Sequence, residues 1–190
     1  MIILLCLLVD LYRQPYTIDN IFDDNDINLI LNKSKSTLRK STTVGSRKEL
    51  NESVRKSKST FLNKDYDTIR ITHKVAQAVG MEDHDCELIH VVKYDPGDYY
   101  KPHQDTCCFE SCRGTSNVDK RIKTVIVYLN DDFQGGETCF PNIQKCIEPK
   151  RGRALVFDTY DMLGRCTHKA KHEGRPIRDG TKYICTFWFH

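Results

Sequence analysis

The fold is decided by residues 94–105, which read YDPGDYYKPHQD. A Pro-Gly turn follows Tyr94, and the stretch ends on the pair His103 and Asp105. Side chains alternate along a strand, so a His and an Asp two residues apart at a strand end point to the same side. Completed by a distant His, they would form the 2-His-1-carboxylate triad typical of non-haem Fe(II). This stretch therefore predicts a strand that carries two ligands of a metal site.

The third ligand has two candidates, His168 and His172, which lie together in residues 167–174, THKAKHEG. Lys169 stands where an HExxH zinc helix needs Glu, so the segment does not match that motif. After His172 the chain passes a turn with Gly and Pro and opens a strand with the cation Lys182. A buried Lys beside the metal could pair with a carboxylate of a co-substrate. This spacing favours His172 as the ligand and predicts that His168 is a surface or supporting residue.

Further along the chain, short runs of β-branched or aromatic residues follow residue 80, separated by Gly, Pro, Asn and Asp. They are residues 87–94, 122–129, 137–140, 154–157 and 183–189. Upstream, residues 16–36 predict a strand, a turn and a helix with acidic N-cap candidates, and residues 65–80 predict a second helix that ends at Gly80. Helices followed by many strands predict a mainly β chain of the α+β class, with an antiparallel β core and N-terminal helices.

The composition is that of one globular domain. The chain has 190 residues and a net charge of +3, from 29 Lys and Arg against 26 Asp and Glu. We expect residues 1–80 to form a strand and helix support region for residues 81–190, within a single structural domain. The weak charge does not suit a dedicated nucleic-acid binder, and a mean hydropathy of -0.54 excludes a membrane bundle. We therefore expect no nucleic-acid partner and no stable membrane insertion, and the sequence leaves the oligomeric state open.

Residues 1–9, MIILLCLLV, are the one continuous apolar run. The run is too short for a membrane-spanning helix, which needs about 20 residues, and no basic segment precedes it. We favour a buried strand or an irregular start over a truncated targeting signal. The sequence does not fix the compartment, and we expect a soluble, cytoplasmic protein in preference to one of the secretory lumen.

The cysteines number nine, a high and odd count, but they form no C-x-x-C pair and no zinc-finger spacing. Free thiols in a reducing compartment are therefore the expectation. Cys107, Cys108 and Cys112 cluster in CCFESC, which could hold a disulfide or a soft metal, although we favour a loop with incidental thiols. Residues 33–64, rich in Lys, Arg, Ser and Thr, predict a solvated loop with one short strand, with a basic groove for an acidic partner as the alternative.

A series of motifs in a fixed order makes the chain resemble the prolyl 4-hydroxylase branch of the Fe(II)/2-oxoglutarate-dependent dioxygenases. The motifs are residues 94–105, 121–129, 135–141, 149–157 and 172–182, and Trp188 closes the series. The resemblance runs from about residue 16 to the end of the chain and is strongest from residue 87 onward. It implies a double-stranded β-helix, or jelly-roll, dioxygenase core in residues 81–190.

The resemblance also implies roles for individual side chains. The iron ligands would be His103, Asp105 and His172. Lys182 would bind the C5 carboxylate of 2-oxoglutarate, with Tyr94 and Thr138 as hydroxyl partners. The catalytic-site residues that face the substrate would be Arg121, Tyr100 and Trp188, although a Trp also suits the core. His90 stands where the family commonly has Gln, and residues 107–118 stand where it carries a substrate loop, so the peptide preference stays open.

The activity implied by the resemblance is peptidyl-prolyl 4-hydroxylation of the procollagen-proline 4-dioxygenase kind. Such an enzyme consumes 2-oxoglutarate and O2 and yields 4-hydroxyproline, succinate and CO2. The implied cofactors are Fe(II), 2-oxoglutarate and L-ascorbate, and the implied partner is a proline-containing peptide or protein. Two alternatives stay open: a related dioxygenase that hydroxylates another side chain or a small molecule, and an inactive peptide-binding module. The intact ligand set together with Lys182 argues against the module.

Overall fold

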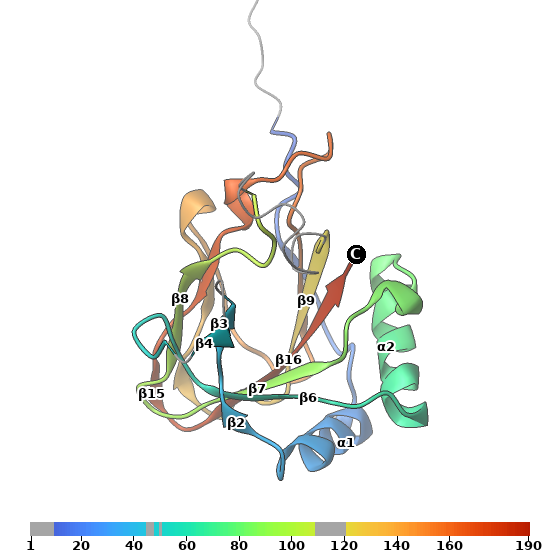
Figure 1. Cartoon of the computed structure of the whole chain (residues 1–190), viewed down its shortest axis with the longest axis vertical. Helices are drawn as coiled ribbons and strands as arrows, with labels where there is room; N and C mark the ends of the chain where they lie inside the picture. The colour runs from blue at the N-terminus through green and yellow to red at the C-terminus, as the bar shows by residue number, and fades with distance from the viewer. Residues whose placement is uncertain (1–9, 45–47, 50, 109–120) are drawn as a thin grey trace, which may run out of the picture.

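Two antiparallel sheets make the body of the molecule (Figure 1). The computed structural model describes residues 10–44, 48–49, 51–108 and 121–190. The seven-stranded sheet has the order β1 (Tyr16–Ile18), β13 (Ala154–Asp158), β9 (Lys123–Tyr128), β16 (Lys182–Phe189), β7 (His90–Tyr94), β6 (Lys58–Phe61), β2 (Arg39–Lys40). The five-stranded sheet has the order β12 (Lys145–Ile147), β11 (Thr138–Phe140), β14 (His172–Gly174), β8 (Tyr99–His103), β5 (Arg55–Lys56). Two short ribbons pair β10 (Gln134–Gly135) with β15 (Ile177–Asp179) and β3 (Thr43–Val44) with β4 (Lys48–Glu49).

The two sheets pack through apolar side chains on their facing sides. Tyr128 and Phe157 of the seven-stranded sheet belong to the same buried cluster as Phe140 and Ile147 of the five-stranded sheet. Such facing residues alternate with outward ones along each strand, as expected for a sandwich of sheets. The predicted antiparallel β core is therefore confirmed.

Two helices cover the outer side of the seven-stranded sheet: α1 (Asp24–Ser34) and α2 (Tyr66–Val79). Figure 1 shows both helices on the side away from β8. Asp65 begins α2 with a reciprocal capping box to Thr68, and Gly80 ends it in the left-handed conformation, with φ at 67°. Both predicted helices are therefore confirmed, and the same local signals explain their ends.

The polar stretch of residues 33–64 differs from the prediction. The sequence predicted one short strand there, and the described residues of this stretch form five, β2 to β6. β6 extends the seven-stranded sheet beside β7, and β5 pairs with β8 in the other sheet. Edge strands are held by backbone hydrogen bonds on one side and carry polar side chains, so their sequences lack an apolar signal. Residues before 81 thus supply strands to both sheets as well as both helices.

The cysteines also differ from the prediction of free thiols. Cys108 is bonded to Cys166 and Cys139 to Cys146, and Cys107 is disulfide-bonded as well. Cys139 and Cys146 lie opposite each other in neighbouring strands, a pairing that no C-x-x-C spacing announces. The expectation of free thiols was wrong for these residues. It holds for Cys86 and Cys185, whose thiols are free and buried.

Several predictions concern residues outside the described ones. These are the interpretation of residues 1–9, the placement of Cys112, and most of the insert at 107–118. Short 3-10 turns complete the described part: η1 (Asp83–Asp85), η4 (Pro141–Ile143) and η5 (His168–Ala170). Among the described residues, no helix has the length and apolar character needed to cross a membrane.

Candidate metal centre

The predicted triad forms at the adjacent ends of two strands of the five-stranded sheet. His103 ends β8, His172 begins β14, and the two residues are direct partners in the antiparallel pair. Asp105 lies two residues beyond β8, and one ligand atom from each of the three residues lies within 4.8 Å of the others. Asp105 Oδ1 is 3.6 Å from His103 Nε2, and Oδ2 is 3.9 Å from His172 Nε2. The structure therefore brings together all three predicted ligands, and His168 is exposed on η5.

Backbone carbonyls orient both imidazoles. His103 Nδ1 is 2.8 Å from the Lys101 oxygen, and His172 Nδ1 is 3.1 Å from the Ala170 oxygen. A carbonyl oxygen only accepts hydrogen bonds, so each Nδ1 carries the proton and donates it. Each Nε2 is then left with a lone pair that faces the centre of the triad, which is the form in which His binds a metal.

Asp105 is held in its charged form. Thr124 Oγ1 and Trp188 Nε1 donate to its Oδ2 over 2.8 and 3.1 Å. Burial alone would raise the pKa of Asp105, but the neighbouring histidines and Arg121 lower it to about 2. Burial, together with His172, lowers the pKa of His103 to about 3, so its imidazole is neutral.

The donor set fits a divalent transition metal. It offers one carboxylate and two imidazoles, grouped at one point and nearly shielded from solvent at Asp105 and His172. Two imidazoles and a carboxylate on one side of the ion are the ligands of non-haem Fe(II) oxygenase sites. Among the described residues, no other cluster of at least three His, Cys, Asp or Glu could hold a metal.

Lys182 lies in the facing seven-stranded sheet and is buried, 2% exposed. It opens β16 and pairs with Tyr94 of β7. Its Nζ donates to the Gly136 carbonyl over 2.6 Å and lies 5.6 and 5.3 Å from the ring centroids of Tyr94 and Tyr128. Burial lowers the pKa of Lys182 to about 7, with Glu137 acting weakly in the opposite direction. A cation held in this state would gain strongly from a ligand carboxylate.

Gly136 makes room for the Lys182 side chain. Its φ is +70°, and a Cβ at this position would meet Ile177 Cδ1 at 2.4 Å and Lys182 Cδ at 3.2 Å. The backbone can therefore approach the lysine only because residue 136 has no side chain. The sequence explained Gly135 and Gly136 as a turn, and the structure adds this close approach to that role.

Residues 89–190 match the family model described as the 2OG-Fe(II) oxygenase superfamily. The chain belongs to this superfamily. A putative prolyl 4-hydroxylase of Acanthamoeba polyphaga mimivirus is 28% identical over 185 residues, which cover 95% of this chain and 75% of the viral protein. Prolyl 4-hydroxylase subunit alpha-2 of Gallus gallus is 29% identical over 73% of this chain, which spans only 26% of that subunit. The expected family relationship is confirmed.

A solved structure supports the fold of this oxygenase. The viral collagen prolyl hydroxylase of Paramecium bursaria Chlorella virus-1, in a structure described as a 2OG complex, superposes with a TM-score of 0.73. It is 24% identical in sequence, and the match covers 93% of this chain and 95% of that chain. The predicted jelly-roll core is confirmed.

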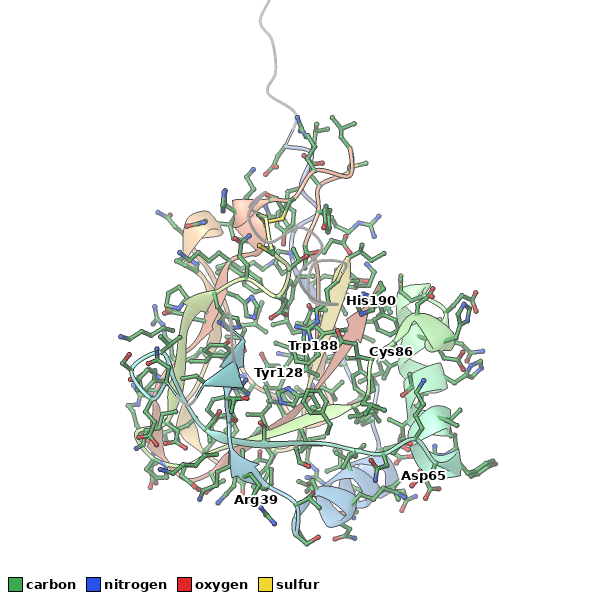
Figure 2. All side chains as sticks on the ribbon, viewed as in Figure 1. Arg39, Asp65, Cys86, Tyr128, Trp188 and His190 are labelled. Carbon is green, nitrogen blue, oxygen red and sulfur yellow. A yellow bond between two sulfur atoms is a disulfide. The ribbon has the colours of Figure 1, made fainter. Side chains whose placement is uncertain are left out.

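Of the two predicted hydroxyl partners of Lys182 in the oxygenase, Tyr94 lies near it directly and Thr138 is connected to it through Tyr128. Tyr94 is buried across the strand pair from Lys182, and burial raises the pKa of its hydroxyl. Thr138 Oγ1 accepts a hydrogen bond from the Tyr128 hydroxyl over 2.9 Å. Tyr128 therefore lies between Lys182 and Thr138 and belongs with them to the proposed co-substrate site. Figure 2 shows Tyr128 in the interior between the two sheets.

Arg121 and Trp188 form a stacked pair beside the triad. The Arg121 guanidinium carbon lies 3.7 Å from the Trp188 ring centroid, and its Nη1 is 3.4 Å from the Asp105 carbonyl oxygen. The same guanidinium donates to both oxygens of Glu87 over 2.5 and 2.8 Å. Trp188 is 9% exposed, so it is a core residue that also contacts a predicted ligand. Both predicted residues therefore touch Asp105.

Tyr100 contacts a different member of the triad, His103. Its ring stacks on the His103 imidazole, with centroids 3.4 Å apart, and the Arg55 guanidinium carbon lies 4.7 Å from the same ring. Tyr100 is partly exposed, whereas His172 is buried. It can therefore present one edge to a ligand while its face restricts the His103 ring.

Sequence reasoning missed several residues of the site: Thr124, Tyr128, Glu87 and Arg55. The signal for two of them was present, because Thr124 and Tyr128 share the inward side of β9 by simple alternation. Glu87 and Arg55 act through ion pairing and stacking with Arg121 and Tyr100. Those contacts depend on strand pairing, which a single sequence does not state.

Proposed function

We propose that this oxygenase is a peptidyl-prolyl 4-hydroxylase. It would convert peptidyl proline, 2-oxoglutarate and O2 to 4-hydroxyproline, succinate and CO2. The observation that carries the proposal is the triad of His103, Asp105 and His172, together with the buried Lys182, whose amine has the Gly136 carbonyl as its hydrogen-bond acceptor and forms no ion pair with a described residue. The viral and animal relatives named prolyl 4-hydroxylases support this choice of substrate.

The residues assigned to the cofactors follow from the donor chemistry. His103, Asp105 and His172 would hold Fe(II) through two Nε2 atoms and one carboxylate. Lys182, with Tyr94 and Thr138, would bind the distant carboxylate of 2-oxoglutarate. When bound, Fe(II) and 2-oxoglutarate together supply an oxidant strong enough to hydroxylate an unactivated carbon, with O2 as the source of oxidising power.

The chain itself contributes binding, charge and orientation. Lys182 keeps its proton when a carboxylate arrives, because the ion pair replaces the water that burial removed. Thr124 and Trp188 hold Oδ2 of Asp105, which leaves Oδ1 available as the ligand atom. These contacts fix the metal ligands before any substrate binds, which is the purpose of preorganised polar groups in an active site.

Arg121, Tyr100 and Trp188 are proposed to orient the peptide. Arg121 and Trp188 stack on each other beside Asp105, and Tyr100 stacks on His103. Proline has a compact, apolar ring that packs well against aromatic faces, and the peptide backbone offers carbonyls to Arg121. His90 lies buried between Phe61 and Trp188 with its ring stacked on both. We expect it to influence which residues flank the target proline.

Three further points are proposals. L-Ascorbate would return iron to the ferrous state after turnover without substrate. We propose a proline-containing peptide or protein as the partner and expect no nucleic-acid partner. The oligomeric state is left unassigned.

The compartment is a separate proposal. The disulfides of Cys108 and Cys139 favour an oxidising compartment, and we propose such a compartment in place of the cytoplasm expected from the sequence. Peptide mapping without reduction, on protein from its native source, tests the compartment.

The test of the function is mass spectrometry of a proline-rich peptide panel after turnover with Fe(II), 2-oxoglutarate, O2 and ascorbate. A gain of one oxygen on proline, matched by an equal amount of succinate, is the expected result. The matched control is the same panel with hydroxyproline at the target position, which should block the modification. Succinate production without any modified proline would instead favour a dioxygenase of other specificity.

A further inference from the structure

The disulfide between Cys108 and Cys166 lies beside the proposed metal centre. Cys108 follows Asp105 by three residues, and Cys166 precedes His172 by six. The two Cα atoms are 5.4 Å apart although the residues are 58 apart in sequence. The bond therefore joins the segment that carries one proposed ligand to the segment that leads into another.

The sheet gives these segments little support at this point. His103 and His172 are the last paired residues at this end of β8 and β14, and the pairing is irregular between His172 and Gly174. Asp105 is already outside the strand. Beyond that pair, the Gln104 side chain donates to the Thr167 carbonyl over 3.0 Å and to the Cys108 sulfur over 3.2 Å. Gln104 thus lies between the two segments and contacts the disulfide itself.

The segment that follows Cys166 also orients His172. It continues through Thr167, whose side chain accepts from the Lys169 N–H at the start of η5, to Ala170. The carbonyl of Ala170 accepts from His172 Nδ1 and so sets the direction of the imidazole. A displacement at Cys166 would therefore reach a metal ligand through a short, continuous stretch of chain.

The second described disulfide offers an internal comparison. Cys139 and Cys146 are opposite residues of β11 and β12, seven residues apart in sequence. Three residue pairs of the antiparallel ladder already hold those strands together. That disulfide lies in the same sheet as the triad but joins strands that carry none of the proposed ligands.

We propose that the Cys108–Cys166 disulfide is a redox-sensitive clamp that positions Asp105 and His172 for metal binding. The inference rests on the proposed metal site of the preceding subsection. With the bond closed, the ligands are held at their spacing. A two-electron reductant such as a phosphine opens it to two thiols and becomes the phosphine oxide, with its oxygen taken from water, and the two segments separate. Metal affinity then falls, and a disulfide-forming oxidant restores it.

The experiment measures Mn(II) affinity from the EPR signal of the free ion, at a temperature well below unfolding. C108S/C166S is expected to bind Mn(II) at least about tenfold more weakly than the wild type, as for loss of other groups that orient metal ligands. The matched control C139S/C146S should stay within about twofold of the wild type, because its disulfide joins β11 to β12, which carry no proposed ligand, and the backbone ladder still pairs β11 with β12 and with β14. Equal weakening in both double variants, or none in either, overturns the clamp.

A second arm uses the wild-type chain and does not depend on the folding of a variant. Protein reduced with a phosphine and then desalted should lose affinity to the level of C108S/C166S and regain it on reoxidation. The control C139S/C146S should respond to reduction as the wild type does, and C108S/C166S should not respond. A wild type that binds Mn(II) equally well in both redox states overturns the clamp but leaves the proposed function intact. If Mn(II) affinity responds to reduction but the enzyme hydroxylates no proline in the peptide panel, the clamp is supported and the proposed function is contradicted.

Discussion

The two sheets differ in how they use their residues. Every residue of β9 is buried, as are almost all of β16, because helices cover one side of the seven-stranded sheet and the other sheet covers the second. In the five-stranded sheet β8 is half-exposed, yet His103 ends this strand and His172 begins its neighbour β14. The seven-stranded sheet provides stability and supporting contacts, whereas the five-stranded sheet provides most of the proposed ligands. Substitutions in the core of the seven-stranded sheet should therefore lower the stability of the protein, whereas substitutions of ligands in the five-stranded sheet should lower its affinity for the metal.

The largest expected effect comes from removing a ligand in the five-stranded sheet. His172→Ala should abolish the visible charge-transfer band of anaerobic Fe(II) with 2-oxoglutarate, because it deletes one of three protein ligands. The matched control is His168→Ala, four residues away on the exposed turn η5, which should keep the band. Loss of the band in the His168 variant, with retention in the His172 variant, would show that the third ligand was misassigned.

A core substitution in the seven-stranded sheet should have the opposite signature. Phe187 is fully buried on the helix side of β16 and packs edge-on against Phe22, with ring centroids 6.2 Å apart. Phe187→Ala should lower the free energy of unfolding by about 3–5 kcal/mol through lost burial and a cavity. Urea unfolding measures this loss. The folded fraction should bind Mn(II) with unchanged affinity, and a large loss of affinity would argue against the division between the sheets.

Trp188 tests the point where the two sheets cooperate. Trp188→Phe removes the Nε1 hydrogen bond to Asp105 Oδ2 but keeps an aromatic ring under Arg121. Mn(II) affinity should fall by about 10-fold to 100-fold, the usual effect of losing a group that orients a metal ligand. Unfolding in urea should change little by comparison. An unchanged affinity would mean that Thr124 alone is enough to hold Asp105.

The smallest effect is a pH dependence at Lys182. Its pKa of about 7 means that the free site is protonated below pH 7 and neutral above it. The groups that face it are Tyr94, Tyr128 and, at longer range, Glu137. Since 2-oxoglutarate binding needs the charged amine, affinity should be constant below pH 7 and fall by up to about tenfold per pH unit above it.

Calorimetric titration of the Mn(II)-loaded protein with 2-oxoglutarate measures that profile. Lys182→Arg is the matched control, because a guanidinium stays charged across this range, so its profile should be flat even if its affinity is lower. A wild-type affinity that rises above pH 7 would contradict the assignment of Lys182 as the carboxylate partner.

The sequence predicts some features well because they depend on nearby residues. The ends of α2 follow from Asp65 and Gly80, and the triad follows from the H-x-D spacing with His172 upstream of Lys182. Signals of this kind come from residues that lie close together in the sequence, so they can be found without the structure. They were enough for the two helices, the main strands and the clustering of His103, Asp105 and His172.

Other features depend on which distant segments meet. The contacts of Thr124 and Trp188 with Asp105 require the register of two strands against a loop. The pairing of Cys108 with Cys166 joins residues 58 apart, with no spacing rule to announce it. The strands of residues 33–64 form through backbone hydrogen bonds to β7, to β8 and to one another, which polar sequences do not reveal. These contacts form only when distant segments of the chain meet in the fold, so the sequence alone did not show them.

The most direct test of the central claim is a crystal structure of the protein with Mn(II) and 2-oxoglutarate, grown without O2. We predict Mn(II) on Nε2 of His103, Nε2 of His172 and a carboxylate oxygen of Asp105, with the far carboxylate of 2-oxoglutarate on Lys182. A metal bound through His168, or a co-substrate carboxylate held by Arg121 with Lys182 unengaged, would contradict this prediction.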